Sequence, residues 1–284
     1  MGYCGAEHQK KDWKTHKLVC TAGSFAVVPV QTWEQRMLAE AHAAAPASLA
    51  ATAALPPIPA WNIGLDGAPP TKIMRAWRKA AEGGHAWAQY NLGNCFNNGI
   101  GVAQDISAAN DWYAKAAAQG FAGAQYNLGV HFRDGIGVSK DFTAAATWFA
   151  KSAAQGDADA QNNLGNFYIN SMGVAKDFTA AAAWYAKAAT QGHVDAQFNL
   201  GNCYRNGVGV AQDFKAAAAW YAMAAAQDDA DAQFNLGVCY EHGEGVVQNI
   251  GAAADWYARA AAQGNTKASA LRDACLARSC HRCR

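Results

Sequence analysis

The stretch AQFNLGNCYRNGVGVAQD, residues 196–213, decides the fold because it returns along the chain at a fixed distance. Its Asn-Leu-Gly core starts at five positions that are 36 residues apart: Asn91, Asn127, Asn163, Asn199 and Asn235. An Ala-Gln before it, a Gly-Val after it and a Trp followed by Tyr or Phe keep the same phase. Five copies in phase, without an insertion, predict a solenoid of stacked repeats.

Each copy predicts two helices. In the first copy, one helix covers residues 86–98 and ends at Gly99, the residue type expected just past a helix C-terminus. The turn Gly-Val-x-x-Asp follows, and Asp105 is placed to cap a second helix over residues 106–119. Two copies depart from the glycine pattern, with Ser171 at the first turn and Asp228 at the last. The expected fold is therefore all-α, an α/α solenoid of two-helix, 36-residue repeats.

Comparison of the copies separates packing positions from free ones. Ala88, Leu92 and Phe96 keep their character in every copy at i, i+4 and i+8, so they are expected to face neighbouring helices. Gly93 also recurs in every copy, which predicts that another backbone passes close by. The Trp-Tyr pair of the second helix is expected to fill the space between repeats.

Positions that vary between copies outline a candidate groove. In two-helix solenoids the first helices line the concave side, so the variable face of the first helix is where a partner would lie. Two alternatives remain open from the sequence: the aromatic members are half-buried packing residues, or the whole face is solvated. The candidate groove residues are Trp87, Tyr90, Asn94, Tyr126, Arg133, Asn166, Phe198, Asn202, Arg205 and Phe234.

Composition argues against several function classes. The 284 residues carry 23 basic and 22 acidic side chains, so no overall field favours nucleic acid or an anionic membrane. The sequence has no run of 18 apolar residues, so it predicts no membrane span. The first twenty residues lack the apolar core of a secretory signal. We therefore expect a cytoplasmic or nuclear protein in a reducing setting. No sequence signature of an enzyme is present.

Most cysteines outside the opening segment look structural. Cys95, Cys203 and Cys239 share one repeat position with His131 and Phe167, and a position that accepts Phe is a packing position. The pair Cys280 and Cys283 in the tail offers too few ligands for zinc. The histidines at turns and helix ends, His85, His193 and His242, are expected to be solvated.

The opening segment YCGAEHQKKDWKTHKLVC, residues 3–20, holds four potential zinc ligands: Cys4, His8, His16 and Cys20. Cys and His pairs separated by three residues are a usual way to bring two zinc ligands together. On one unbroken helix His8 and His16 would lie about 12 Å apart, too far to share an ion. Either the chain bends back into one site, or the two pairs serve two ions. A remnant helix without metal is the third alternative.

Two family resemblances follow from these patterns. The 36-residue pattern from residue 86 to 263 resembles the Sel-one-like repeat (SLR), an α/α solenoid related to tetratricopeptide repeats, which implies a non-catalytic scaffold that binds other proteins. Residues 3–20 resemble the C-terminal half of a MYND-type zinc finger, matching at Tyr3, Cys4, Gln9, Trp13, His16, Lys17 and Cys20. Such fingers bind two zinc ions and short proline-containing peptides, so Cys4 and His8 would belong to one zinc and His16 and Cys20 to the other.

The domain organisation expected from these patterns has four parts. Residues 1–20 are a partial finger whose four upstream cysteines have no counterpart, since the chain begins at Met1. Residues 21–70 are an Ala/Pro-rich linker with a short helix. Residues 71–265 are the solenoid, with five full repeats and a degenerate half-repeat, and residues 266–284 are a capping helix and tail. An adaptor is the leading interpretation; a fragment of a larger MYND-containing enzyme and a structural solenoid with a vestigial finger are the alternatives. The sequence does not indicate the oligomeric state.

Overall fold

The computed structural model describes residues 71–281, within a compact unit that spans Ala68–Arg284. The predicted finger over residues 1–20, the linker over 21–70 and residues 282–284 lie outside the described residues. Every regular element of the described part is an α-helix, which confirms the all-α prediction. None of these helices is long and apolar enough to cross a membrane. The helices are α2 Thr71–Glu82, α3 Ala86–Asn98, α4 Ile106–Ala118, α5 Ala122–Asp134, α6 Phe142–Ala154, α7 Ala158–Asn170, α8 Phe178–Thr190, α9 Val194–Asn206, α10 Phe214–Ala225, α11 Ala230–His242, α12 Ile250–Ala262 and α13 Thr266–His281.

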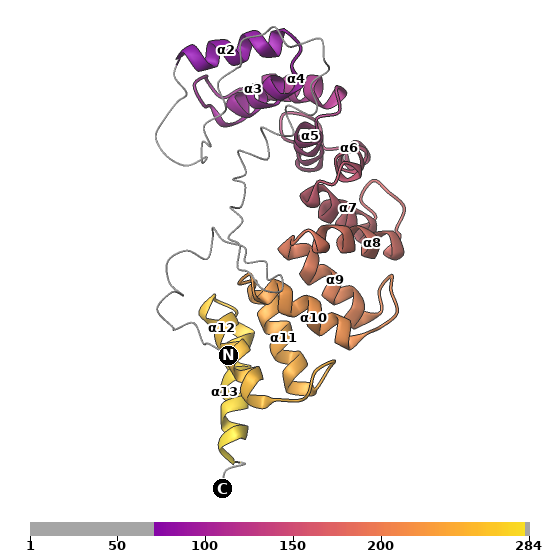
Figure 1. Ribbon diagram of the computed structural model, residues 1–284, viewed down its shortest axis with the longest axis vertical. Helices are drawn as coiled ribbons and strands as arrows, with labels where there is room; N and C mark the ends of the chain where they lie inside the picture. Colours follow the sequence, from indigo (N-terminus) through magenta and orange to yellow (C-terminus); the bar gives the residue numbers. More distant parts are fainter. Residues whose placement is uncertain (1–70, 282–284) are drawn as a thin grey trace, which may run out of the picture. The chain divides into compact units, whose positions relative to one another are not determined.

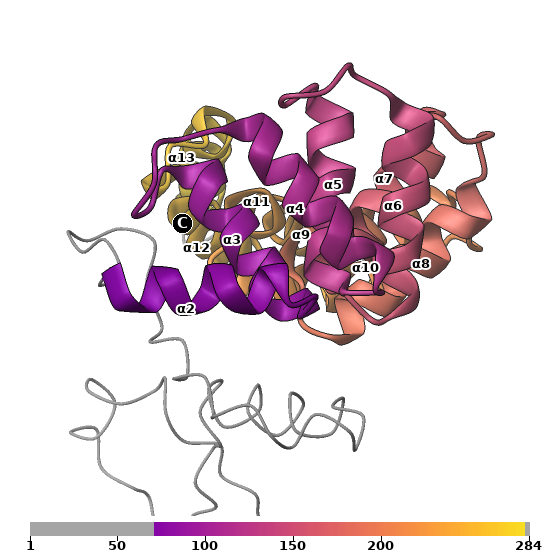
Figure 2. The same cartoon turned by 90° about the horizontal axis from the view of Figure 1, so that it is seen from above.

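The helices follow one another as antiparallel pairs, one pair per repeat. Figure 1 shows these pairs following an arc, with α5, α7 and α9 on its inner side and α6, α8 and α10 on its outer side. In Figure 2, seen from above, successive pairs wind around the long direction of the solenoid instead of stacking straight. The first helix of a repeat therefore supplies the inner face, as the sequence predicted.

The helix ends have the chemistry that the repeat pattern predicts. Asp105 accepts a hydrogen bond from the backbone N–H of Ala108 at 2.9 Å, and the equivalent residues of the other repeats cap α6, α8, α10 and α12 in the same way. Gly99 closes α3 with a φ of 68°. Ser171 and Asp228 take glycine positions with φ of 57° and 65°, the only non-glycine residues with positive φ in the described part. This conformation is costly for a residue with a side chain.

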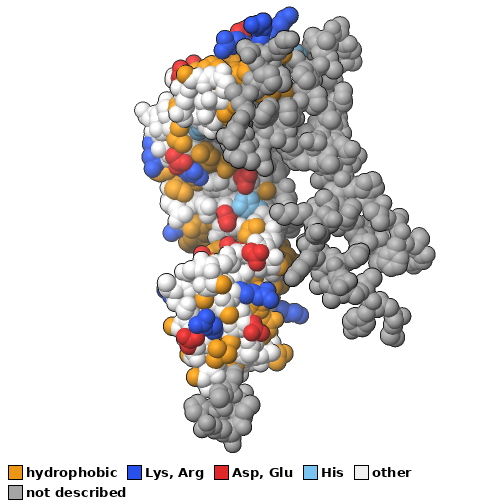
Figure 3. All heavy atoms as spheres, turned by 90° about the vertical axis from the view of Figure 1, so that its left-hand side faces the viewer, with side chains coloured by type: hydrophobic (Ala, Val, Ile, Leu, Met, Phe, Trp, Pro, Cys, Tyr) orange, Lys and Arg blue, Asp and Glu red, His pale blue; other side chains and the backbone are white. Residues whose placement is uncertain are grey.

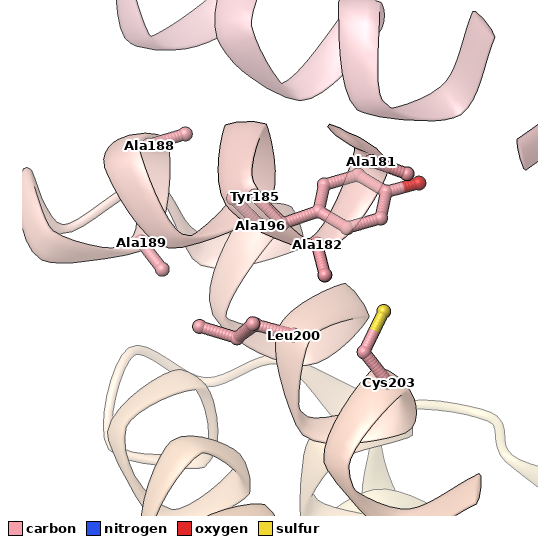
Figure 4. Packing of buried hydrophobic residues seen from close by; sticks show 8 residues of the cluster. All are labelled: Ala181, Ala182, Tyr185, Ala188, Ala189, Ala196, Leu200 and Cys203. Carbon is pink, nitrogen blue, oxygen red and sulfur yellow. The ribbon is translucent and has the colours of Figure 1, made fainter. Parts of the chain in front are cut away.

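The core of each repeat lies between alanine-rich faces and one large ring. In Figure 4 the ring of Tyr185 from α8 lies above Leu200 and Cys203 of α9 and beside Ala181 and Ala182. The equivalent rings in the other repeats are 0–1% exposed, and those residues are Tyr113, Phe149, Tyr221 and Tyr257. The Trp that precedes each ring is only half-buried. The predicted bulk between repeats therefore comes mainly from the second member of the pair.

The recurrent glycine of Asn-Leu-Gly makes room for this ring. A Cβ added to Gly165 would lie 2.5 Å from Cε1 of Tyr185, and the same holds at Gly93, where the ring of Tyr113 lies 2.6 Å away. The nearest backbone atom at Gly93 is the carbonyl oxygen of Ala109, at 3.3 Å. The glycine does mark a close approach, but an aromatic ring makes it, and the prediction of a passing backbone was wrong in this respect.

Buried glutamines connect consecutive helices. Gln161 of α7 donates through Nε2 to the carbonyl oxygen of Ala153 in α6 and accepts through Oε1 from Gln191 at the end of α8, at 3.1 and 2.9 Å. The same two bonds recur at Gln89, Gln125, Gln197 and Gln233. Because these amides are at most 5% exposed and both their nitrogen and their oxygen are hydrogen-bonded, they hold three helices in register.

Single helices close both ends of the described solenoid. α2, the expected half-repeat, buries Met74 and Trp77, and Met74 meets Cys95 of α3. α13 packs on α12 through Ala268 and Cys275. It runs from Thr266 to His281, within the residues 266–284 expected to form a capping helix and tail.

Candidate protein-binding groove

The candidate groove residues lie on the inner face of the first helices. The aromatic residues among them are only partly exposed there, because they also pack on the core. Tyr90, Tyr126, Phe198 and Phe234 are each half-buried. Their rings lie 5.7–6.1 Å from the core rings of the second helices, centroid to centroid. Each thus packs on a core ring of its own repeat, and Tyr90 also packs on Phe121 at the start of the next repeat, with 4.9 Å between ring centroids.

The asparagines of the candidate groove are hydrogen-bonded to the same core rings. Oδ1 of Asn166 accepts the phenol of Tyr185 at 2.7 Å, and Asn94 and Asn202 accept those of Tyr113 and Tyr221 at 2.8 and 2.7 Å. Their side chains are consequently fixed in orientation. A partner on the inner face would meet amides that are already positioned.

The two groove arginines are already paired. Arg133 forms two hydrogen bonds to Asp134, at 2.8 and 2.7 Å, and reaches Oδ1 of Asn163 in the next repeat at 2.7 Å. Arg205 contacts Glu244 with Nε and Nη2, both at 3.1 Å. Both pairs are about a third exposed, so they hold the side chains in place while contributing little to stability.

Trp87 lies toward the N-terminal end of the groove. Its ring meets Trp77 of α2 edge-on, at 6.2 Å between centroids. The structure therefore places this candidate, which lies at the start of α3, against the N-terminal closing helix.

His193 departs from the sequence-based expectation. It was expected to be solvated at a turn, but its side chain is only 15% exposed and caps α9 by accepting the N–H of Ala196 at Nδ1, over 3.2 Å. The proton of the neutral ring is therefore on Nε2, which lies 3.0 Å from Oδ1 of Asp159. This bond raises the pKa of His193 and lowers that of Asp159. The expectation failed because Asp159 lies on α7, far from His193 in the sequence, so the local pattern around His193 does not show it.

A row of carboxylates was not among the sequence candidates. Asp159, Asp195 and Asp231 hold the same position in the first turns of α7, α9 and α11, and all three are exposed. Figure 3, which looks onto the inner side of the arc, shows acidic side chains around a histidine at mid-height. The row could have been found by aligning the repeats, because the three Asp recur at a spacing of 36 residues. It did not stand out, since acidic residues are common in the first turn of a helix, where they complement the helix dipole.

The described residues contain no group of three His, Cys, Asp or Glu side chains that could hold a metal ion. The four candidate zinc ligands of the opening segment lie outside the described residues. Within the described part, Cys95, Cys203 and Cys239 are buried and free, and Cys275 is buried as well.

The family model of the Sel1 repeat matches the chain five times, at residues 88–121, 122–157, 158–193, 194–229 and 230–265. The chain belongs to the Sel1 repeat family. A MYND finger model matches residues 1–20, so both resemblances drawn from the sequence are confirmed. No curated protein matches the chain.

Two solved structures show the same Sel1 repeat architecture at substantial identity. One is c5321, a protective antigen of uropathogenic Escherichia coli strains with an SLR fold: it is 39% identical, with a TM-score of 0.67, over 70% of this chain and 42% of that one. The other is a Sel1 repeat protein from Oxalobacter formigenes: it is 34% identical, with a TM-score of 0.65, over 71% of this chain and 80% of that one. The chain thus spans less than half of the Escherichia coli protein.

Proposed function

We propose that this Sel1 repeat protein is a non-enzymatic adaptor that docks another protein on the inner face of its solenoid and carries a zinc-binding finger segment. The observation that supports docking is the contrast between the two sides of the first helices. Most core-facing positions keep their character from repeat to repeat, whereas the inner positions differ and present half-exposed rings, fixed amides and paired arginines. Packing of the repeats requires the core-facing positions to stay similar, whereas the inner positions are free to vary and so to suit a partner.

A pair of matched double variants tests the groove. Arg133→Ala with Asn235→Ala removes one cation and one amide from the inner face, and Lys215→Ala with Thr179→Ala removes a cation and a hydroxyl from exposed positions of the outer helices. We expect the inner-face variant of the full chain to capture less of its partner proteins from an extract of its own cells, and the outer variant to capture as much as wild type. Equal capture by both variants, at unchanged melting temperature, would contradict the groove.

We propose further that Cys4, His8, His16 and Cys20 bind zinc, as two half-sites or as one site formed by a bend, and that the finger takes proline-containing peptides. Thiolate and imidazole are donors that zinc prefers, and the match of a MYND finger model to residues 1–20 supports this proposal. Metal analysis of the purified full chain should find bound zinc that is lost in a Cys4→Ser, Cys20→Ser variant and kept in a Cys203→Ala variant. A chain purified without zinc, and unable to take it up, would mark the finger as vestigial. The free thiols of the buried residues Cys95, Cys203 and Cys239 agree with a reducing compartment, the cytoplasm or nucleus.

A further inference from the structure

Both ring nitrogens of His193 are hydrogen-bonded, and each to a different helix. Nδ1 accepts the backbone N–H of Ala196 in the first turn of α9, and Nε2 donates to Oδ1 of Asp159 in α7. The imidazole therefore caps one first helix and ties it to the first helix before it. These two bonds depend on the neutral ring in different ways.

A second bridge of the same kind lies at the start of α13, made by a side chain that does not titrate. Asn265 accepts the N–H of Ala268 through Oδ1 at 3.2 Å and donates through Nδ2 to Oδ1 of Asp231 in α11 at 3.4 Å. The two bridges hold the same positions of the 36-residue repeat, two repeats apart. Capping one helix while holding the previous first helix is thus a recurrent arrangement of this solenoid.

Protonation of His193 removes one of its two bonds. The free lone pair of the neutral ring is on Nδ1, so an added proton must go there, where it points at the N–H of Ala196. Two donors then face each other, and the cap of α9 is lost. The new positive charge also lies at the N-terminus of a helix, where the helix dipole disfavours it.

The bond between the two helices becomes stronger at the same time. Nε2 keeps its proton and now belongs to a cation 3.0 Å from the carboxylate of Asp159. Among the described residues, the charged groups that act on the ring are Asp159 and Asp195, and the end of α8 contributes its backbone, where the carbonyl oxygen of Ala188 accepts the N–H of His193. The bond to Asp159 raises the pKa of His193, although burial opposes the shift.

Loss of the cap leaves the fold of the solenoid intact. The helices α3 and α5 begin after His85 and Phe121, which form no side-chain cap, and both helices have the same length as α9. A first helix therefore forms without this hydrogen bond. What changes is the order of its first turn, whose amides lack partners within the helix.

We propose that His193 is a pH-sensitive link between α7 and α9: uptake of a proton on Nδ1 releases the first turn of α9, while the ion pair with Asp159 holds the ring on α7. The link at Asn265 has the same geometry and stays closed at every pH at which the chain is folded. This inference concerns the solenoid itself and goes beyond the proposed docking function.

The test follows amide hydrogen exchange of the full chain by NMR between pH 8 and pH 5, corrected for the intrinsic pH dependence of exchange. The protection factor of the Ala196 amide should fall about fivefold as His193 is protonated, which corresponds to about 1 kcal/mol for the cap. The Ala268 amide, capped by Asn265, is the control within the same chain and should change by less than about twofold. Constant protection of Ala196 would overturn the proposal.

A substitution taken from the second bridge removes the titrating group. His193→Asn should keep the protection of Ala196 within about twofold over the same pH range, because Asn is a good cap and has no charged form. The matched control is His85→Asn, since His85 holds the same repeat position and forms no side-chain cap. This control should lose protection at Ala196 in acid as the wild type does. An equal loss in His193→Asn would overturn the proposal.

Global stability separates this local release from a general effect of acid. Because the pKa of His193 is raised in the folded chain, the folded state binds this proton more tightly than the unfolded state. Stability relative to His193→Asn should therefore rise as the pH falls through the folded pKa and level off below the unfolded one, as measured by urea denaturation. A fall in both global stability and local protection would overturn the proposal. No partner takes part in these measurements, so their outcome is independent of the docking function.

Discussion

The phenol of Tyr185 donates a hydrogen bond to Oδ1 of Asn166 over 2.7 Å, and across the repeats the hydroxyl of the core ring occurs together with an acceptor. Repeats with Asn at this position have Tyr in the second helix. In the second repeat Val130 replaces the Asn, and the ring is Phe149, which has no hydroxyl. In the fifth repeat the position is again Val, and Tyr257 donates to Glu241 instead, at 2.7 Å. The hydroxyl is present only where an acceptor exists.

This relationship predicts a strong coupling between Asn166 and Tyr185. Asn166→Val leaves the buried hydroxyl of Tyr185 without its acceptor, and should lower the free energy of unfolding by about 1–3 kcal/mol. Adding Tyr185→Phe reproduces the natural combination of the second repeat and should restore part of that loss. Urea denaturation of the two single variants and the double variant measures the coupling. Additive effects of the two changes would show that the hydrogen bond does not link them.

Two glycine substitutions should have opposite effects. Gly165→Ala forces a methyl group against the ring of Tyr185, and we expect it to destabilise the solenoid by about 1–3 kcal/mol. Gly251→Ala is the matched control within helix α12, where the nearest atom to the new Cβ is Oδ1 of Asn249 at 3.4 Å. It should stabilise the protein by up to about 1 kcal/mol through helix propensity. Thermal unfolding followed by circular dichroism distinguishes the two, and a stabilising Gly165→Ala would refute the ring-contact explanation.

The repeat made the fold predictable from sequence to a fine level. A pattern that recurs every 36 residues reveals which positions are fixed, and the fixed ones proved to be caps, glycines next to rings, and buried glutamines. The helix over 86–98 and the cap at Asp105 were predictable because each depends on neighbours in sequence.

Contacts between repeats were harder to predict from the same pattern. The bond from His193 to Asp159 spans 34 residues, and that from Asn199 to Asn162 spans 37, so neither partner is apparent from local spacing. The sequence also does not show how much of each aromatic groove candidate is exposed and how much is packed on the core, because this depends on the position of the ring. Tyr126, for instance, rests on Phe149 with a centroid distance of 5.8 Å, a detail that periodicity alone does not specify.

Three of the repeat cysteines should resist alkylation in the native protein. Burial raises the pKa of Cys95, Cys203 and Cys239 to about 11, so almost no reactive thiolate exists at pH 8. Iodoacetamide treatment of the native full chain, followed by peptide mass mapping, should leave these three residues unmodified, and treatment in urea should modify them all. Rapid native labelling of any of the three would show that its site opens to solvent.

The free energy of unfolding should acquire a pH dependence from His131. Its ring is 5% exposed and lies against Asn110, with Nδ1 2.6 Å from Oδ1, while Nδ2 of Asn110 donates to the carbonyl oxygen of Ile136 at 3.0 Å. Oδ1 is thus the atom facing the ring, so Nδ1 carries the proton of the neutral form. Burial lowers the pKa of His131 below its usual 6.5, although the charge of Asp134 opposes the shift.

The direction of this pH dependence follows from which state, folded or unfolded, takes up the proton first. As the pH falls below the usual pKa, the unfolded chain binds a proton at this histidine before the folded one does, so the free energy of unfolding decreases and levels off below the folded pKa. The double variant His131→Cys, Asn110→Ala lacks the imidazole. It introduces the combination of Cys and Ala that another repeat has at the equivalent positions, Cys203 and Ala182. Between pH 8 and pH 5 the wild type should therefore lose more stability than the variant in urea titrations, and His193, present in both, cancels in the comparison. Parallel stability curves for the two proteins would mean that His131 titrates alike in the folded and unfolded states.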